Sequence, residues 1–246
     1  MLHPDECKRR IYEHERVACC ISGGKDSMAV AMHLRPFWDR ITFYWSNPGD
    51  PLPETFELMR KFAELVPNYV EVTSNVILDR EEHGMPSDVV PENMITFHTL
   101  ITGEVPEFYV QHRVHCCINN FYAPLHNRLI ADHVTLVIRG EKQTDHYRNY
   151  QIYDGYVDPN EVHYMLPLWD TTTEQVLEYM KMYPEFLHPV YEFEDAGGID
   201  CMGCTAWIQE ISMPYLEKYH PEVAKVRREK INIIEKNSIA LLQFLC

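Results

Sequence analysis

The chain has 246 residues, of which 46% are hydrophobic and 24% charged, and its formal net charge is −15 at pH 7. This length can bury a substantial core, and no run of residues is apolar for long enough to suggest a membrane span. Such acidity disfavours broad nucleic-acid binding, which depends on Lys and Arg neutralising phosphates. The first residues lack the basic and then apolar pattern of a secretion signal, so we expect a cytoplasmic protein.

Apolar runs alternate with helical patterns along the chain, as is typical of βα units. We predict strands over residues 17–21, 41–45, 69–72 and 135–138, with helices over 28–34 and from 53 to about 66. Residues 79–111 show no clear period and are interpreted as a loop with short helices, a candidate lid. The expected fold class is α/β: a mainly parallel, doubly wound sheet with helices on both faces and a helical C-terminal cap.

No repeat or low-complexity linker divides the chain, so we expect a single domain over residues 1–246. Its core would span about 16–207, followed by a helical extension over 208–246. The mixed charges between residues 217 and 230 are interpreted as a solvated helix face.

A glycine turn separates the first predicted strand from the first predicted helix. Its glycines let the backbone approach a ligand, and the helix start offers unpaired N–H groups and a positive dipole end. One lysine adds charge and two serines add hydroxyl donors, so the turn suits a phosphate or sulfate; the alternative is a simple capped turn. The spacing fits neither the Walker pattern nor the dinucleotide-binding pattern. The turn consists of Ser22, Gly23, Gly24, Lys25, Asp26 and Ser27.

This turn resembles the Ser-Gly-Gly-x-Asp-Ser loop of the PP-loop ATP pyrophosphatases, the adenine nucleotide alpha hydrolase-like superfamily. That superfamily includes the phosphoadenylyl-sulfate (PAPS) reductases and several sulfur-inserting enzymes. Further segments are similar to PAPS reductase motifs and keep their order from residue 17 to about 207. They are Ser46-Asn47-Pro48-Gly49 with Pro53-Glu54-Thr55, Cys116-Cys117 with Pro124-Leu125, Gly140-Glu141-Lys142 with Asp145 and Arg148, Pro167-Leu168-Trp169-Asp170, His188-Pro189-Val190-Tyr191, and Cys201-Met202-Gly203-Cys204-Thr205.

The resemblance implies sulfur chemistry on an adenine nucleotide: PAPS, adenylyl sulfate or ATP. Residues 22–27 would hold its phosphosulfate or pyrophosphate, together with Gly140, Lys142 and Arg148. Two departures leave the choice between PAPS and adenylyl sulfate open. Asn120-Phe121 replaces a basic Arg-Lys pair of the family, and Ser46 replaces an aspartate.

The chain contains eight cysteines, which in a cytoplasmic protein indicate metal or redox chemistry before structural disulfides. Cys116-Cys117 and Cys201-x-x-Cys204 resemble the set that ligates a 4Fe–4S cluster in the adenylyl-sulfate branch of the family. Thiolates suit soft iron. Structural zinc and unligated thiols remain alternatives, although adjacent cysteines are unusual among zinc sites. A further pair, Cys19-Cys20, lies in the first predicted strand and is expected to pack in the core.

In the reductase family, a cysteine near the C-terminus attacks the substrate sulfur, and thioredoxin or glutaredoxin then releases sulfite. Here Cys246 stands at that end, but its context is apolar, with no neighbouring Glu or His to lower its pKa. It is either the nucleophile on a mobile tail or the last residue of a packed helix.

The sequence is therefore consistent with three functions. The first is a PAPS or adenylyl-sulfate reductase-like oxidoreductase. The second is a PP-loop enzyme that splits ATP into AMP and pyrophosphate and transfers sulfur to a nucleic acid or another acceptor, although the acidity counts against a nucleic acid. The third is a nucleotide-binding protein without turnover. The oligomeric state is open, with a homo-oligomer among the alternatives.

Overall fold

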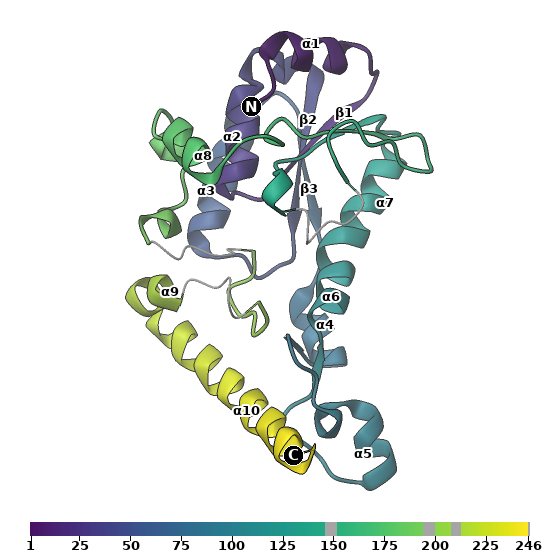
Figure 1. Ribbon diagram of the computed structural model, residues 1–246, viewed down its shortest axis with the longest axis vertical. Coiled ribbons are helices and arrows are strands. Elements are labelled where there is room, and N and C mark those ends of the chain that lie inside the picture. Colours follow the sequence, from purple (N-terminus) through teal and green to yellow (C-terminus); the bar gives the residue numbers. More distant parts are fainter. Residues whose placement is uncertain (146–151, 194–199, 208–212, 246) are drawn as a thin grey trace. The chain divides into compact units, whose positions relative to one another are not determined.

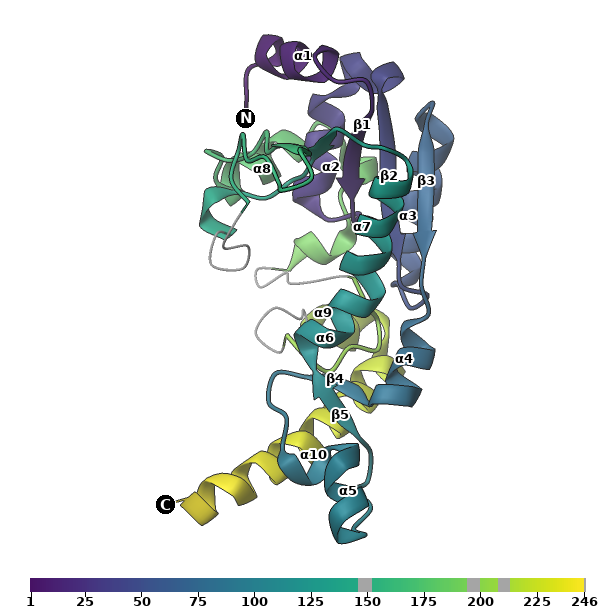
Figure 2. The ribbon, with the colours of Figure 1, turned by 90° about the vertical axis from the view of Figure 1, so that its right-hand side faces the viewer.

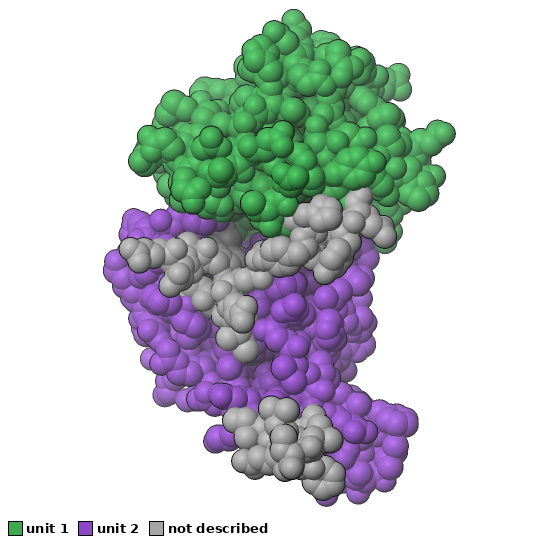
Figure 3. Space-filling view, in the orientation of Figure 1, with its two compact units in different colours: residues 1–47, 53–72, 124–189 green, residues 48–52, 73–123, 190–246 purple. Residues whose placement is uncertain are grey.

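The computed structural model describes residues 1–145, 152–193, 200–207 and 213–245, and it divides the chain into two compact units (Figure 3). Unit 1 consists of Met1–Asn47, Pro53–Val72 and Pro124–Pro189. Unit 2 consists of Pro48–Leu52, Thr73–Ala123 and Val190–Cys246. Each unit is thus assembled from separate stretches of chain. No helix within the described ranges is long and apolar enough to cross a membrane.

Unit 1 is built on a five-stranded sheet in the order β3-β2-β1-β6-β7. Its strands β1, β2 and β3 are labelled in Figure 1. β1 pairs in parallel with β2 and β6, and β6 pairs in parallel with β7. The four predicted strands are confirmed, whereas β7 was not predicted because its residues do not form an apolar run like that of the equally short β6. The strands are β1 (Val17–Ile21), β2 (Ile41–Asn47), β3 (Tyr69–Thr73), β6 (Leu136–Ile138) and β7 (His163–Met165).

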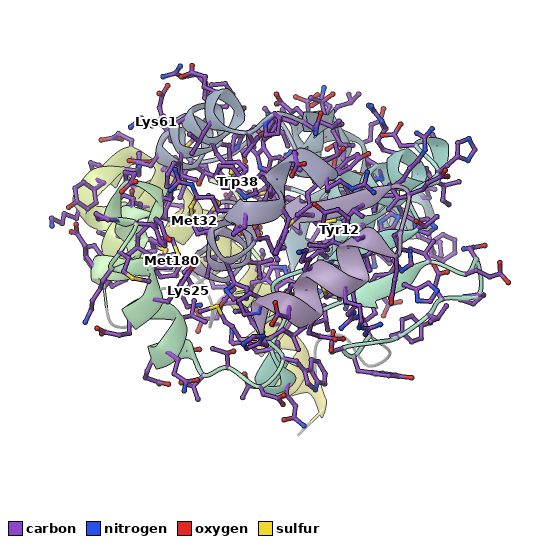
Figure 4. All side chains as sticks on the ribbon, turned by 90° about the horizontal axis from the view of Figure 1, so that it is seen from above. Tyr12, Lys25, Met32, Trp38, Lys61 and Met180 are labelled. Carbon is purple, nitrogen blue, oxygen red and sulfur yellow. The ribbon has the colours of Figure 1, made fainter. Side chains whose placement is uncertain are left out.

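Helices cover both faces of this sheet, as predicted. Val17, Cys19 and Ile21 belong to a large core with α1, α2, α3 and α8, where Met32 and Met180 pack on the same side (Figure 4). The alternate residues Ala18 and Cys20 belong to a second core with α7. Both cysteines of β1 therefore pack in the core, as expected. The helices are α1 (Pro4–Tyr12), α2 (Lys25–His33), α3 (Pro53–Leu65), α7 (Ala123–Ala131) and α8 (Thr173–Met180).

The central position of β1 determines where a ligand can bind in unit 1. From β1 the chain proceeds to β2 and β3 on one side, and it later adds β6 and β7 on the other. The strand order therefore reverses between β1 and β6. Open α/β sheets bind ligands beyond the carboxyl ends of the strands at such a switch point. The predicted anion loop follows β1 directly, and Gly140 lies just beyond β6.

Unit 2 contains a small parallel sheet of β4 and β5 together with several helices (Figure 2). The short helices predicted for residues 79–111 are present, but the sheet was missed because each strand has only three residues. The C-terminal segment is helical, as expected. The elements are α4 (Val76–His83), β4 (Met85–Ser87), α5 (Thr96–Thr102), β5 (Val110–His112), α6 (Arg113–Cys117), the π-helix η3 (Ile118–Tyr122), α9 (Met213–Tyr219) and α10 (Pro221–Leu245).

Short 3-10 helices complete the described chain: η1 (Arg35–Arg40), η2 (Glu92–Met94), η4 (Gln143–Asp145), η5 (Pro184–Phe186) and η6 (Pro189–Glu192).

Candidate functional site

The anion loop of unit 1 is closed by its own serines and depends on one glycine in particular. Ser27 Oγ accepts a hydrogen bond from Ser22 N at 3.1 Å and donates one to Gly24 O at 3.0 Å. Gly23 has φ +80°, a conformation that side chains other than glycine rarely adopt, whereas Gly24 is extended at φ −72° and caps α2. The left-handed turn is thus made by Gly23, and the start of α2 follows it.

Two lysines meet at one aspartate beside this loop. Asp26 Oδ2 lies 2.7 Å from Lys25 Nζ, and Asp26 Oδ1 lies 2.8 Å from Lys142 Nζ. Lys142 is only 3% exposed, and its Nζ also lies 3.4 Å from Asp145 Oδ2. The aspartates hold both ammonium groups in place and balance their charges. An anion at the start of α2 would add its charge to a site that already contains two oriented cations and a helix dipole.

Gly140 brings the end of β6 against the same loop. A Cβ built on Gly140 would lie 2.9 Å from Asp26 C and 2.9 Å from Ser27 N, closer than atoms can pack. The structure therefore brings together residues 22–27, Gly140 and Lys142, which lie far apart in the sequence. Arg148, the remaining predicted member of this site, lies outside the described residues.

Gly140→Ala is expected to distort the anion loop although residue 140 contributes no charge. The added methyl group would press on the backbone at the start of α2, and such overpacking costs about 1–3 kcal/mol. Affinity for the adenine nucleotide that the family resemblance implies should fall, as measured by calorimetry, and the midpoint of urea unfolding should be lower. If the variant had the nucleotide affinity and the unfolding midpoint of the wild type, the expected clash between residue 140 and the start of α2 would not occur.

A second candidate site lies in unit 2, where the four predicted cysteines occur. Cys116 and Cys117 end α6, and Cys201 and Cys204 lie in the loop before α9. The thiols of Cys116, Cys117 and Cys201 each lie close enough to Cys204 for their thiolate forms to repel its own. Burial raises the pKa of Cys116 to about 12 and that of Cys117 to about 11, and it also raises the pKa of the other two. The uncomplexed thiols are therefore protonated at neutral pH.

The Cys201–Cys204 loop is held by Asp50, which sequence reasoning did not identify. Asp50 O accepts a hydrogen bond from Met202 N at 2.7 Å, and Asp50 Oδ2 accepts one from Gly203 N at 2.9 Å. The same Oδ2 lies 2.6 Å from Arg80 Nη1. A Cβ on Gly203 would lie 3.0 Å from Arg80 Nη1, so glycine leaves room for this ion pair. The sequence offered one indication of this role: Asp50 directly follows Ser46–Gly49, a segment that resembles a family motif.

Asn120 and Trp207 flank the other cysteine pair. Asn120 replaces a basic residue of the family motif, and its buried Nδ2 donates to Cys116 O at 3.0 Å and lies 3.9 Å from Cys116 Sγ. Burial raises the pKa of the Cys117 thiol and the neighbouring Trp207 side chain opposes this shift, while the Arg113 guanidinium stacks 4.0 Å from the Trp207 ring centroid. A π-helix follows the two cysteines, and such helices are frequent at functional sites.

The interpretation of residues 217–230 as a solvated helix face is wrong for Arg227. This side chain is 5% exposed and interacts electrostatically with Cys204 and Cys201, whereas its neighbour Arg228 is 60% exposed. Charge alternation cannot distinguish two adjacent arginines, because burial depends on which side of α10 meets the rest of unit 2.

Two of the predicted chemical roles gain no direct support from the geometry. Across the described ranges, no three His, Cys, Asp or Glu side chains converge as a site for a single metal ion. Cys246, the candidate nucleophile, lies outside the described residues.

No protein-family model matches the chain, and no curated protein matches its sequence. Among solved structures, the chain is similar to the crystal structure of a phosphoadenylyl-sulfate (PAPS) reductase from Candida auris in a phosphate complex. The two share 12% sequence identity and a TM-score of 0.57, over 81% of this chain and 88% of that one. The fold is thus that of the PAPS reductases, which confirms the resemblance at the level of the fold.

Proposed function

We propose that the chain binds an adenine nucleotide at residues 22–27 and releases sulfite from PAPS or adenylyl sulfate. The observation that carries this proposal is the loop at the β1–β6 switch point, with Lys25 and Lys142 held beside a helix start. This arrangement provides cations, backbone N–H groups and a dipole for a phosphate or sulfate group. The PAPS reductase of the same fold was solved as a phosphate complex, which is consistent with an anion-binding role for this fold.

We further propose that Cys116, Cys117, Cys201 and Cys204 hold a 4Fe–4S cluster. Their thiols are partly or fully buried in one unit, and the other three each lie close enough to Cys204 for their thiolate forms to repel its own. Around zinc, with Zn–S bonds of about 2.3 Å, the sulfur atoms of a tetrahedral site would lie only about 3.8 Å apart. In a cluster each thiolate binds its own iron, so no single metal ion has to contact all four thiols. When bound, the cluster supplies redox-active iron and a delocalised negative charge.

Cys246 is the proposed nucleophile. Its thiolate would attack the substrate sulfur, break the bond between that sulfur and the phosphate oxygen, and release AMP or its 3′-phosphate. The resulting cysteine S-sulfonate would then be cleaved by the dithiol of thioredoxin or glutaredoxin, which supplies two electrons, becomes a disulfide and frees sulfite.

The decisive experiment uses anaerobically purified protein incubated separately with PAPS, adenylyl sulfate and ATP in the presence of a thioredoxin system. We expect sulfite from one or both adenylyl sulfates. Formation of AMP and pyrophosphate from ATP, with no sulfite from either sulfate, would favour the sulfur-transfer enzyme instead. Tight nucleotide binding with no product from any of the three would favour a binding protein.

Cys246→Ser is expected to abolish sulfite release while nucleotide affinity stays at the wild-type value, because binding and covalent attack are assigned to different residues. Wild-type protein incubated with substrate but without a reductant should accumulate a sulfonate on Cys246, detected by mass spectrometry and removed by thioredoxin. Normal turnover by the variant would assign the attack to another thiol.

A further inference from the structure

Two arginines are buried beside the cysteines of unit 2 with unsatisfied guanidinium groups. The side chain of Arg80, on α4, is 9% exposed, and Arg227, on α10, is 5% exposed. Within the described part of the chain, Nε and Nη2 of Arg80 and Nε of Arg227 have no hydrogen-bond partner. A buried charge of this kind is costly unless something compensates it.

The surrounding carboxylates do not account for both charges. Arg80 has one ion pair, with Asp50, which also attracts Arg227 from a greater distance, and Arg227 forms no ion pair among the residues that the structure describes. Asp200 also interacts with Cys201 and Cys204, but it is exposed to solvent. An arginine guanidinium carries its charge at neutral pH, so both groups are positive. Excess positive charge is therefore buried beside the cysteine loop.

Both arginines are held toward the same loop. Arg80 Nη1 lies 3.0 Å from the Cβ position of Gly203, the residue before Cys204. Arg227 follows Ala224 by one helical turn, and Ala224 belongs to a core against which Met202 packs. Each guanidinium lies close enough to Cys201 and Cys204 to attract their thiolate forms. The uncompensated charge thus faces the two cysteines that would become thiolates on metal binding.

We propose that Arg80 and Arg227 are positioning residues of the cysteine site, whose buried charges balance a thiolate-bound 4Fe–4S cluster and raise its reduction potential. This inference rests on the cluster of the proposed function. Net charge and hydrogen bonds around the sulfur atoms set the potential of such clusters. Adjacent positive charge stabilises the reduced, more negative state most, so removing it should make the potential more negative and weaken cluster retention.

The test compares full-length, anaerobically reconstituted wild type with Arg227→Lys, Arg227→Met and Arg228→Met. The lysine variant keeps the charge, and the methionine variant keeps an apolar stem without it. Arg228 is the matched control, since it is exposed and pairs with Glu217 on the surface. The readouts are the reduction potential from an EPR-monitored titration, iron and sulfide content, and the rate of iron loss to a chelator.

We expect Arg227→Met to shift the potential to a more negative value and to lose iron several-fold faster, while Arg227→Lys and Arg228→Met stay close to wild type. A full cluster with an unchanged reduction potential and an unchanged rate of iron loss in Arg227→Met would overturn the inference about the arginines. It would not contradict the proposed cluster itself. Equal damage from lysine and methionine would also overturn it, because packing rather than charge would then be the cause.

If circular dichroism shows that Arg227→Met is unfolded, Arg80→Lys and Arg80→Met provide the same comparison at the second guanidinium, judged by the same criteria. A wild type that binds neither iron nor sulfide contradicts the proposed cluster, and the inference falls with it.

Discussion

Cys201→Ser is expected to remove iron and sulfide from a protein that is brown and contains both in equal amounts when purified anaerobically. Each of the four cysteines would bind one iron, so the loss of one thiolate opens the cluster and exposes it to solvent and oxidation. Cys117→Ser, which removes a thiol of the Cys116-Cys117 pair, should have the same effect. Because the ligands come from α6 and from a distant loop, loss of the cluster should also lower the unfolding midpoint.

The measurements are iron and acid-labile sulfide per chain, the visible absorption spectrum and thermal unfolding. Cys20→Ala is the matched control, since it removes a thiol from β1 in unit 1 and should leave the iron content unchanged. Zinc without sulfide in the wild type would assign the four thiols to a structural zinc site. A wild type without any metal, even after reconstitution, would leave them as unligated thiols.

Lys25→Ala is expected to weaken adenine-nucleotide binding by roughly ten- to a hundredfold, because a charge-assisted hydrogen bond to a bound anion contributes about 1.5–3 kcal/mol. Gly23→Val should be more damaging. Valine is strained at φ +80°, and its Cβ would lie 3.3 Å from Thr55 Cγ2 and 3.4 Å from Met59 Sδ. The loop would then lose the shape that presents the start of α2.

Calorimetry with AMP, ATP and adenylyl sulfate measures both effects, and circular dichroism verifies that the variants fold. Lys61→Ala, an exposed lysine on α3 of the same unit, controls for the loss of one positive charge (Figure 4). Gly24→Ala is a second comparison, since residue 24 has an ordinary φ and should tolerate a side chain better than residue 23. Unchanged binding in both Lys25→Ala and Gly23→Val would show that the loop is only a turn.

Several features followed from the sequence because they depend on neighbouring residues. Buried parallel strands are continuous apolar runs, so β1 and β2 were predictable, and a glycine turn between a strand and a helix identified the anion loop. The short strands β4, β5 and β7 were not predictable, because none of them is a continuous apolar run such as the one that identified the equally short β6. The resemblance to PAPS reductases was carried by the order of short motifs, and the structure confirms it for the fold.

The sequence by itself determined the α/β class, the position of the anion loop and the candidate cysteines, because periodicity and residue chemistry are local properties. Only the tertiary structure decided that Lys142 and Gly140 lie against the loop, and that Gly23 rather than Gly24 adopts the left-handed turn. It also decided that Arg227 is buried while Arg228 is not. Contacts and burial of this kind arise when segments far apart in the chain pack together, and no local pattern encodes which of two similar side chains then meets the interior.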